Sequence, residues 1–392
     1  RLSAIYELNN HISMKKNIFN NLNLDIGYFF LLTMASIGLI IWVIQAVNFL
    51  DIVSEDGHSL RVYFFYTIYS LPKIFGKILP LIFFISVFYM LIVYENKNEL
   101  IIFWTIGISK LKFINYIVFF SLIYLIIQII LLTFIIPTSL DKARSYFRNS
   151  DLDLFSSLIK EKKFIDTVAG LTIFVEKKNG NDLEKVYFKD VLDGNQSQII
   201  FAKTGKIINT KKGDILKLYD GRFMNVSKDK QNLFEFSETE INLSKYETKT
   251  TTHPKIQETP SSSLFKCLQK INRLQNIFTT HEIIFKNEKN CALANHKEVK
   301  QELFKRLTLP IYIPLIALIA SMISLVSKNY KYFSYWKLIV FSLGVIIIII
   351  SEISINYLSL SSLSTFIFLL LPLLIFTIIY SIILIRTQHF KL

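Results

Sequence analysis

The sequence predicts an α-helical membrane protein with six transmembrane helices, three on each side of an inserted all-β domain. Of its 392 residues, 52% are hydrophobic, and the mean hydropathy of +0.41 is too high for a soluble domain of this size. The hydrophobic residues are concentrated in six runs, each long enough to cross a bilayer core of ~30 Å. A hydrophilic block separates the third run from the fourth, and its short alternating segments indicate β-strands.

The six candidate spans share an almost complete lack of charge. They are residues 27–50, 74–94, 113–137, 308–327, 338–360 and 364–385. Only two charged residues lie within them, Lys77 and Glu352. The first run is too long for a signal peptide, lacks a small-residue cleavage site and is followed by further spans, so we expect a membrane helix. The first methionine is Met14, followed by two lysines, and we expect residues 1–13 to be an upstream extension.

Lysines in the short connections predict the orientation in the membrane. They precede the first span and recur in residues 95–112, 328–337 and 386–391. The connection 51–73 instead has two cations against three acids, and the loop near 358–363 has no charge. Because Lys and Arg are enriched on the cytoplasmic side, we expect both termini and residues 95–112 to be cytoplasmic. The hydrophilic block is then expected on the opposite side of the membrane in this multi-pass protein.

The hydrophilic block divides into a β region and a helical connector. Residues 139–252 contain short apolar or alternating runs at roughly ten-residue spacing, separated by turns such as NG and DG. This pattern is typical of an antiparallel sandwich or jelly roll, and we expect its strands IFVEKK and QIIFAK to line an apolar edge or cleft. Helical spacing then follows a polar break. The expected domains are 1–13, 14–138 with the first three spans, 139–252, the connector 253–305, and 306–392 with the last three spans.

Catalytic and metal-binding motifs are absent from the sequence. There is no phosphate-binding G-x-x-x-x-G-K-[ST] loop, no G-x-S-x-G nucleophile motif and no metal-ligand spacing, so we expect no catalytic residue, cofactor or metal. The formal net charge of +14 comes largely from flanking lysines and β-domain turns, which does not indicate nucleic-acid binding. Cys267 and Cys291 lie in the connector, where an oxidising compartment permits a disulfide. The favoured interpretation is two unpaired cysteines.

The stretch ENKNELIIFWTIGISK, residues 95–110, joins the second span to the third and is neither a loop nor a span. It begins with charge, continues as LIIFWTI and breaks at Gly107. A short helix with an acidic start and an apolar LIIFW face needs a partner's groove or the lipid interface to cover that face. The alternative is an amphipathic elbow that rests on the membrane.

Four segments together resemble the lipopolysaccharide-export permeases of the LptF/LptG (YjgP/YjgQ) family. The first is KILPLIFFISVFYMLIVYENKNELIIFWTIGISKLKF, residues 77–113. The others are WVIQAVNFLDIV (42–53), FIDTVAGLTIFVEKK (164–178) and QELFKRLTLPIYIPLIAL (301–318). In the last segment, Phe304 and Lys305 replace the His and the first Arg of the family's Leu-His-Arg-Arg stretch. The resemblance covers residues 14–392, and residues 42–53 favour the LptF branch.

The resemblance implies one permease half of an ABC transporter that is not itself an enzyme. Such proteins form a heterodimer with a second permease half and sit on two copies of a cytosolic ATPase. They extract lipopolysaccharide from the inner membrane and pass it to a single-span periplasmic jelly-roll partner like LptC and a bridge like LptA. Residues 95–109 would be the coupling helix that docks on the ATPase. The expected coupling residues are Glu95, Glu99, Trp104 and Gly107, with Glu99 facing the ATPase and Gly107 ending the helix.

The phosphates on the headgroup of such a glycolipid would bind to cationic side chains, so we expect cations at the periplasmic ends of the spans. The expected substrate-binding residues are Gln45, Asn48, Arg61, Lys73, Lys77, Arg144, Lys305, Arg306 and Glu352; Asp51, Lys142, Arg148 and Asn356 lie beside them in the sequence. Lys77 is the strongest candidate because it lies one turn inside its span, where it can pair with Glu352. The alternative is that these cations reach to lipid phosphates as ordinary interface anchors.

Two other function classes remain open at this point. The chain can be a membrane-anchored receptor or scaffold whose periplasmic β domain binds a partner without transport. It can also be a secondary transporter, although the spans lack a Gly/Pro-broken pair at the midplane and hold few charges. Co-purification of a small cytosolic ATPase would separate the ABC permease from both.

Overall fold

The computed structural model describes the backbone of residues 2–50, 60–150, 159–165, 171–193, 196–210, 213–227, 230–243, 255–275, 291, 295–357 and 362–389. The chain forms two compact units. One, the helical unit, comprises Arg1–Trp42, Ser70–Leu140 and Pro254–Leu392. The other, the β unit, comprises Val43–Tyr69 and Asp141–His253, so it includes helix ends on both sides of the first connection as well as the sheet.

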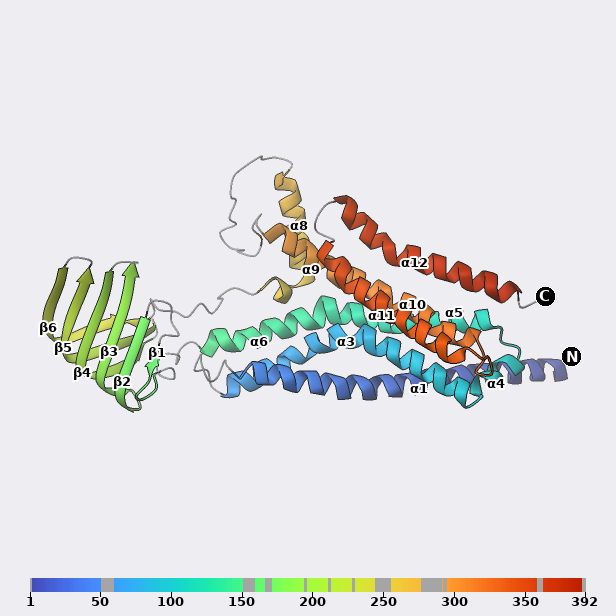
Figure 1. Cartoon of the computed structure of the whole chain (residues 1–392), viewed down its shortest axis with the longest axis horizontal. Coiled ribbons are helices and arrows are strands. Elements are labelled where there is room, and N and C mark those ends of the chain that lie inside the picture. The colour runs from blue at the N-terminus through green and yellow to red at the C-terminus, as the bar shows by residue number, and fades with distance from the viewer. Residues whose placement is uncertain are drawn as a thin grey trace. The chain divides into compact units, whose positions relative to one another are not determined.

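Helices account for most of the helical unit (Figure 1). The first half of the chain contains α1 (Leu2–Asn48), α3 (Leu60–Asn96), α4 (Glu99–Thr105), α5 (Lys110–Ile130), the π-helix η1 (Leu131–Ile135) and α6 (Ile136–Ser150). The connector contains the 3-10 turn η4 (Ile256–Glu258), α8 (Ser261–Gln275) and α9 (His296–Thr308). The last part contains η7 (Leu309–Ile311), α10 (Tyr312–Ser321), η8 (Met322–Leu325), α11 (Phe333–Tyr357) and α12 (Ser362–His389).

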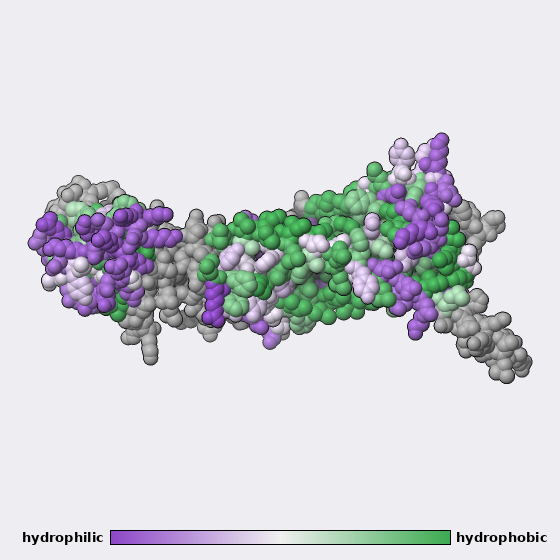
Figure 2. Space-filling model, turned by 90° about the horizontal axis from the view of Figure 1, so that it is seen from below, coloured by the Kyte–Doolittle hydropathy of each residue, from purple (hydrophilic) through white to green (hydrophobic). Residues whose placement is uncertain are grey.

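Six helical stretches are long and apolar enough to cross a membrane, which confirms the predicted three-plus-three arrangement. They are Met14–Asn48, Leu60–Asn96, Lys110–Tyr146, His296–Leu325, Phe333–Ile355 and Leu369–Thr387. Figure 2 shows a broad hydrophobic surface over these helices, whereas the surface of the β unit is mainly hydrophilic. An α-helix satisfies most of its backbone hydrogen bonds internally, which is the condition for spanning a hydrocarbon layer.

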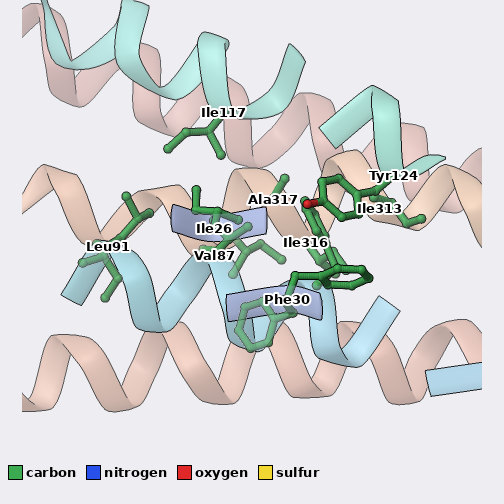
Figure 3. Close-up of a cluster of buried hydrophobic side chains, with 14 of the residues drawn as sticks. Ile26, Phe30, Val87, Leu91, Ile117, Tyr124, Ile313, Ile316 and Ala317 are labelled. Carbon is green, nitrogen blue, oxygen red and sulfur yellow. The ribbon is translucent and has the colours of Figure 1, made fainter. Parts of the chain in front are cut away.

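The core of the helical unit lies where α1, α3, α5 and α10 meet (Figure 3). The labelled side chains there are Ile26, Phe30, Val87, Leu91, Ile117, Tyr124, Ile313, Ile316 and Ala317, all of them buried. Nearly every side chain of α10 is buried. In contrast, only 11% of the apolar window of α1 and of α12 is buried, which leaves these two helices at the periphery.

Two contacts fix the position of α3, one with α11 and one with α5. Gly344 of α11 faces the ring of Phe84, and a Cβ atom there would overlap that ring. Pro80 lacks an N–H group, so the carbonyl of Gly76, four residues earlier, has no helical donor. The side-chain amide Nε2 of Gln128 donates to this carbonyl at 2.8 Å and replaces the missing bond across to α5.

The β unit contains one antiparallel sheet. Its strands are β1 (Phe164–Ile165), β2 (Leu171–Asn179), β3 (Asp182–Asp193), β4 (Gln196–Thr210), β5 (Gly213–Ser227) and β6 (Lys230–Asn242). Each strand pairs with the next in chain order. The predicted antiparallel β domain between the third and fourth spans is confirmed, although the described strands form a single meander rather than the two sheets of a sandwich.

The alternation of buried and exposed side chains slips by one residue along a line that crosses β3, β4 and β5. Lys185 (φ 52°) and Asp220 (φ 47°) have left-handed backbone conformations, and the register places Lys203 of β4 between them. Because a slip of one residue moves side chains to the other face, Leu183 and Val186 both face the core although they are three residues apart. The slip thus keeps one face hydrophobic along strands that bend.

The strands IFVEKK and QIIFAK, which were expected to line an apolar edge or cleft, contribute side chains both to the buried core and to a groove. Ile173, Phe188 and Ile200 lie opposite one another on adjacent strands and are all buried. Aromatic rings form a row on neighbouring positions, where Phe164 contacts Phe174 with ring centroids 4.7 Å apart. A groove of about 1030 Å³ follows this row across the sheet.

The connector holds a disulfide. Cys267 and Cys291 are bonded, with Cα atoms 5.7 Å apart, so the interpretation of two unpaired cysteines was wrong. The pairing follows from helix geometry, because Leu264, Cys267 and Ile271 lie on one face of α8 and pack against Val299 of α9. Cys291 lies between the two helices and joins this small core.

Candidate functional site

The segment between α3 and α5 forms a tight hairpin, residues 95–110, which we call the α4 hairpin. It enters α4 through Asn98, which has φ 64°, and leaves it through Gly107, which has φ 80°. A Cβ atom on Gly107 would meet nothing within 4 Å, so glycine is required there by its backbone conformation and not by space. The helix within the hairpin is Glu99–Thr105, shorter than the expected 95–109. The expected break at Gly107 is present.

The faces of α4 differ from the expected arrangement. Leu100 and Phe103 are completely buried, and Trp104 packs edge-on against Phe113 with centroids 5.4 Å apart. The exposed apolar residues are Ile101 and Ile102, at 51% and 47% exposure. The aromatic side chains therefore belong to the protein's own core, and the surface available to another molecule consists of the isoleucine pair beside the half-exposed Glu99.

Glu95 lies inside the helical unit. Its side chain is 8% exposed, and its Oε1 accepts a hydrogen bond of 2.7 Å from the backbone N–H of Lys328. Lys328 in turn donates from Nζ to the backbone carbonyl of Asn96 at 3.0 Å. Glu95 thus joins the α4 hairpin to the turn after η8, whereas the sequence assigned it to a contact with another protein.

Arg306 of α9 is also internal. It is 1% exposed, and its guanidinium donates to Oε1 of Glu302, to the carbonyls of Gln257 and Thr259, and to Oγ of Ser261, at 2.8–3.0 Å. A buried charge is stable only when it is paired and hydrogen-bonded in this way. The structure therefore gives Arg306 a role in holding residues 257–261 against α9, and these bonds occupy the donors that a phosphate would use.

The same segment is tied to the third span. Oγ of Ser261 donates to the carbonyl of Thr133 at 3.0 Å. Thr133 lies in the π-helix η1, and such π-helical turns are often found at functional sites. Arg306 and Ser261 therefore form a chain of hydrogen bonds from α9 to η1.

Three lysines gather beside this network. Lys73 of α3 lies within electrostatic reach of Lys305 and Lys255, and also of Glu302 and Glu258. The sequence predicted Lys73 and Lys305, and the structure brings them together. Lys255 was missed, because it lies in the polar break before the connector and belongs to no motif or periodic pattern.

Lys77 follows Lys73 by one helical turn. Both side chains are exposed, and residues four apart lie on the same face of a helix. Glu352 of α11 is exposed as well. Among the ion pairs of the described side chains, none joins Glu352 to Lys77, so the expected pairing is not present in this conformation.

The remaining predicted residues belong to the β unit. Gln45 is half-buried and Asn48 exposed near the end of α1, and Arg144 is half-buried in α6. Arg61 lies over the ring of Phe65, with 5.9 Å between the guanidinium carbon and the ring centroid. Lys142 is exposed, while Asp51 and the side chains of Arg148 and Asn356 lie outside the described residues.

Comparison with known proteins identifies the family. Residues 25–386 match the profile of the family described as "Lipopolysaccharide export system permease LptF/LptG". A Rickettsia prowazekii (strain Madrid E) protein named "Uncharacterized protein RP871" is 24% identical over 173 residues, which are 44% of this chain and 48% of that protein. The chain thus aligns with about half the length of this relative. Because the profile extends from within α1 to within α12, the chain belongs to the LptF/LptG family of lipopolysaccharide export permeases.

Proposed function

We propose that this protein is one half of an ABC permease that extracts lipopolysaccharide from the inner membrane and passes it to a periplasmic bridge. Membership of the LptF/LptG family is the observation that carries the proposal. Residues 42–53 favour the LptF branch. The chain itself supplies the path for the lipid, and ATP is hydrolysed by a separate cytosolic ATPase dimer.

We place both termini and the α4 hairpin in the cytoplasm, and the connector and β unit in the periplasm. The distribution of lysines supports this orientation. The disulfide Cys267–Cys291 supports it independently, because disulfides persist in the oxidising periplasm and are rare in the cytoplasm.

The peripheral helices support pairing with a second permease half. Large apolar side chains such as Leu31 and Leu32 of α1 and Leu374 and Ile378 of α12 are more than half exposed. In a membrane these faces contact either lipid or another protein. A heterodimer would cover part of them and enclose a cavity for the acyl chains between the two halves.

The ATPase is proposed to dock on α4. Ile101 and Ile102 provide an exposed apolar pair suited to a groove, and Glu99 adds a negative charge at the start of the helix. Trp104 and Gly107 support this surface from behind, Trp104 by packing against Phe113 and Gly107 by ending the helix. Glu95 contributes through its bond to Lys328 rather than by contact with the ATPase.

The headgroup site is proposed to centre on Lys73, Lys77, Lys255 and Lys305. Lys255 and Lys305 each lie within electrostatic reach of Lys73, and each of these lysines can act as a point charge for a phosphate. Gln45, Asn48, Arg61, Arg144 and Glu352 remain proposed contacts along the path. Arg306 is left out, because its donors are engaged within the protein.

The β unit is proposed to receive the acyl chains in the groove that follows its aromatic row. Phe164, Phe174 and Phe201 line this groove and offer an accessible apolar surface, whereas Ile173, Phe188 and Ile200 are buried on the same strands and their immediate neighbours. A photo-crosslinker at Ile173 or Ile200 should form adducts with labelled lipopolysaccharide. Adducts with protein alone would indicate that the β unit shields the transporter and does not carry lipid. A jelly-roll partner like LptC and a bridge like LptA would extend the path by pairing with an edge strand.

Reconstitution tests the whole proposal. The chain should co-purify with a second permease half and a P-loop ATPase, and proteoliposomes containing the complex should release lipopolysaccharide to an acceptor only with ATP. Ile101→Asp should abolish ATPase binding, because a charge on the exposed pair opposes burial in a groove. Asn329→Asp, on an exposed position outside the α4 hairpin, is the matched control. A chain that binds a periplasmic protein but no ATPase would favour the receptor or scaffold alternative.

A further inference from the structure

The α4 hairpin is held at both of its ends by the same segment of the protein, residues 322–328, in which η8 ends the fourth span. At the first end, Glu95 accepts from the N–H of Lys328, and Lys328 Nζ donates to the carbonyl of Asn96. Lys328 is the donor in both bonds, and it lies 233 positions after Glu95 and 232 positions after Asn96 in the chain. They join the end of α3 to the turn between η8 and α11.

At the second end, Lys110 makes the corresponding contact. Lys110 is the first residue of α5, and its Nζ donates to the carbonyl of Leu325 at 2.9 Å. Leu325 is the last residue of η8, where helical carbonyls have no partner within the helix. The lysine therefore satisfies a backbone group that would otherwise be left without a donor.

The 322–328 segment also collects contacts from the last two spans. Nε1 of Trp336, near the start of α11, donates to the carbonyl of Met322 at 3.1 Å. The guanidinium of Arg386, near the end of α12, lies over the Trp336 ring at 5.2 Å. This segment is thus the place where the ends of α3, α5, α11 and α12 are joined to α10.

The accepting residues of two of these bonds are buried. Glu95 and Leu325 are each 8% exposed, and Ile323 and Ser324, which precede both contacts in the chain, are buried as well. Charge-assisted hydrogen bonds are stronger where water is excluded. The outer face of α4, by contrast, exposes Ile101 and Ile102. The hairpin therefore has an accessible tip, Ile101 and Ile102, and a base, which we define as the contacts of Glu95, Asn96 and Lys110 with the 322–328 segment.

We propose that Glu95 and Lys110 are positioning residues that make the α4 hairpin and the 322–328 segment move together. Movement imposed on α4 by the ATPase then reaches α10, the most buried helix of the unit, and not only α3 and α5, to which the hairpin is covalently joined. This inference rests on the proposed function, since it requires an ATPase bound at α4. It predicts that breaking the base separates ATP hydrolysis from transport while leaving docking intact.

The test compares variants of the full permease complex in proteoliposomes, measuring ATPase affinity, ATP turnover and lipopolysaccharide released per ATP. Glu95→Ala should bind the ATPase within twofold of the parent and lower the release per ATP about tenfold, the effect of one charged hydrogen bond. Glu95→Gln keeps an acceptor oxygen and should restore most of the release. Lys328→Ala keeps its backbone N–H and should have a smaller effect than Glu95→Ala.

Lys331→Ala is the matched control for loss of a lysine, because Lys331 lies in the same turn and its Nζ is over the exposed Tyr332 ring, away from both contacts. It should behave as the parent. Unchanged release per ATP in Glu95→Ala would overturn the inference. Loss of ATPase binding in Glu95→Ala would also overturn it, since Glu95 would then act on docking. A parent complex that does not bind an ATPase would instead refute the proposed function.

A crosslinking experiment covers the case in which Glu95→Ala does not fold. Cysteines at Asn96 and Asn329, both exposed, can be joined by a short bismaleimide without affecting the native disulfide. If the two segments move as one body, the joined protein should transport as well as the single-cysteine variants treated in the same way. Loss of transport on joining, with ATP turnover retained, would show that the segments must separate and would overturn the inference.

Discussion

Arg306 and Glu95 are both buried charges that tie distant segments together, but they do so with very different numbers of bonds. Arg306 donates to four groups of its own unit and is 1% exposed. Glu95 accepts one bond from a backbone N–H and is 8% exposed. A joint with four bonds keeps most of its contacts when one bond is lost, whereas a joint with one or two bonds depends on each of them. We call Arg306 with its four partners the anchor, and Glu95 with Lys328 the clasp.

Removing the anchor should have the largest effect. Arg306→Ala leaves the Glu302 carboxylate and two carbonyls without their donor, and breaking a buried charged pair typically costs about 3–5 kcal/mol. The free energy of unfolding in detergent, measured with and without the substitution, should fall by about this amount. Lys305→Ala, next in sequence and only half-buried, should cost less than ~1 kcal/mol. Equal effects of the two substitutions would contradict the anchor role.

The disulfide should contribute the next largest effect. Cys267→Ser with Cys291→Ser removes a link that closes a stretch of 24 residues, for which the chain-entropy account gives about 3 kcal/mol. Arg306 and the disulfide both hold the connector. The triple variant that combines Arg306→Ala with both cysteine substitutions therefore tests whether their contributions are independent. A loss smaller than the sum of the two separate losses would show that the two ties stabilise the same folding unit.

Removing the Glu95 carboxylate should lower the free energy of unfolding less than removing Arg306. Glu95→Ala should lower the free energy of unfolding by about 2 kcal/mol, the typical contribution of one hydrogen bond to a charged group. Glu95→Gln should recover part of this loss, since its carbonyl oxygen can still accept from Lys328. If Glu95→Ala proves as destabilising as Arg306→Ala, the distinction between anchor and clasp is lost.

An exposed ion pair in the β unit should make the smallest contribution to stability among the charged contacts compared here. Glu176 contacts Lys185 at 2.6 Å on the surface, and the hydrogen bond and charge of this lysine lower the pKa of the Glu176 carboxyl. A lowered pKa in the folded state means that the contribution is present above the unfolded pKa and lost as the pH falls through the folded value. NMR titration of Glu176 should show the lowered pKa, and Lys185→Met should remove the shift.

That surface pair should have little effect on stability, because exposed ion pairs are screened by water and salt. Glu176→Gln at neutral pH should leave the unfolding midpoint nearly unchanged. If Glu176→Gln shifted the unfolding midpoint as much as Glu95→Ala does, burial would not explain why the Glu95 and Arg306 contacts stabilise the protein more than a surface ion pair.

Hydropathy and turn chemistry were sufficient to predict the six spans, the inserted β domain and the break at Gly107. These features depend on local sequence, because a run of apolar residues or a left-handed glycine is visible within a few positions. Lys73 and Lys305 were predicted to share a site because lysines near the ends of spans are easily recognised. In the structure Lys305 lies within electrostatic reach of Lys73, and the role of the two lysines in headgroup binding stays a prediction.

The roles of Glu95 and Arg306 could not be predicted from sequence, because their partners are mostly backbone groups. The N–H of Lys328 and the carbonyls of Gln257 and Thr259 exist at every position and leave no pattern in the residue types. A charge near a membrane end can therefore be assigned to a ligand when the fold uses it internally. The one-residue slip at Lys185 and Asp220 is hidden for a similar reason, since neither residue type requires a left-handed backbone.

The bond from Gln128 to Gly76 has a consequence for how the chain is inserted into the membrane. Until α5 arrives, the carbonyl that Pro80 leaves without a helical donor would face hydrocarbon, where an unsatisfied backbone group costs several kcal/mol. Synthesis delivers α3 well before Gln128 emerges from the ribosome. The second and third spans are therefore expected to leave the insertion machinery for the lipid as a pair, with the α4 hairpin already closed between them.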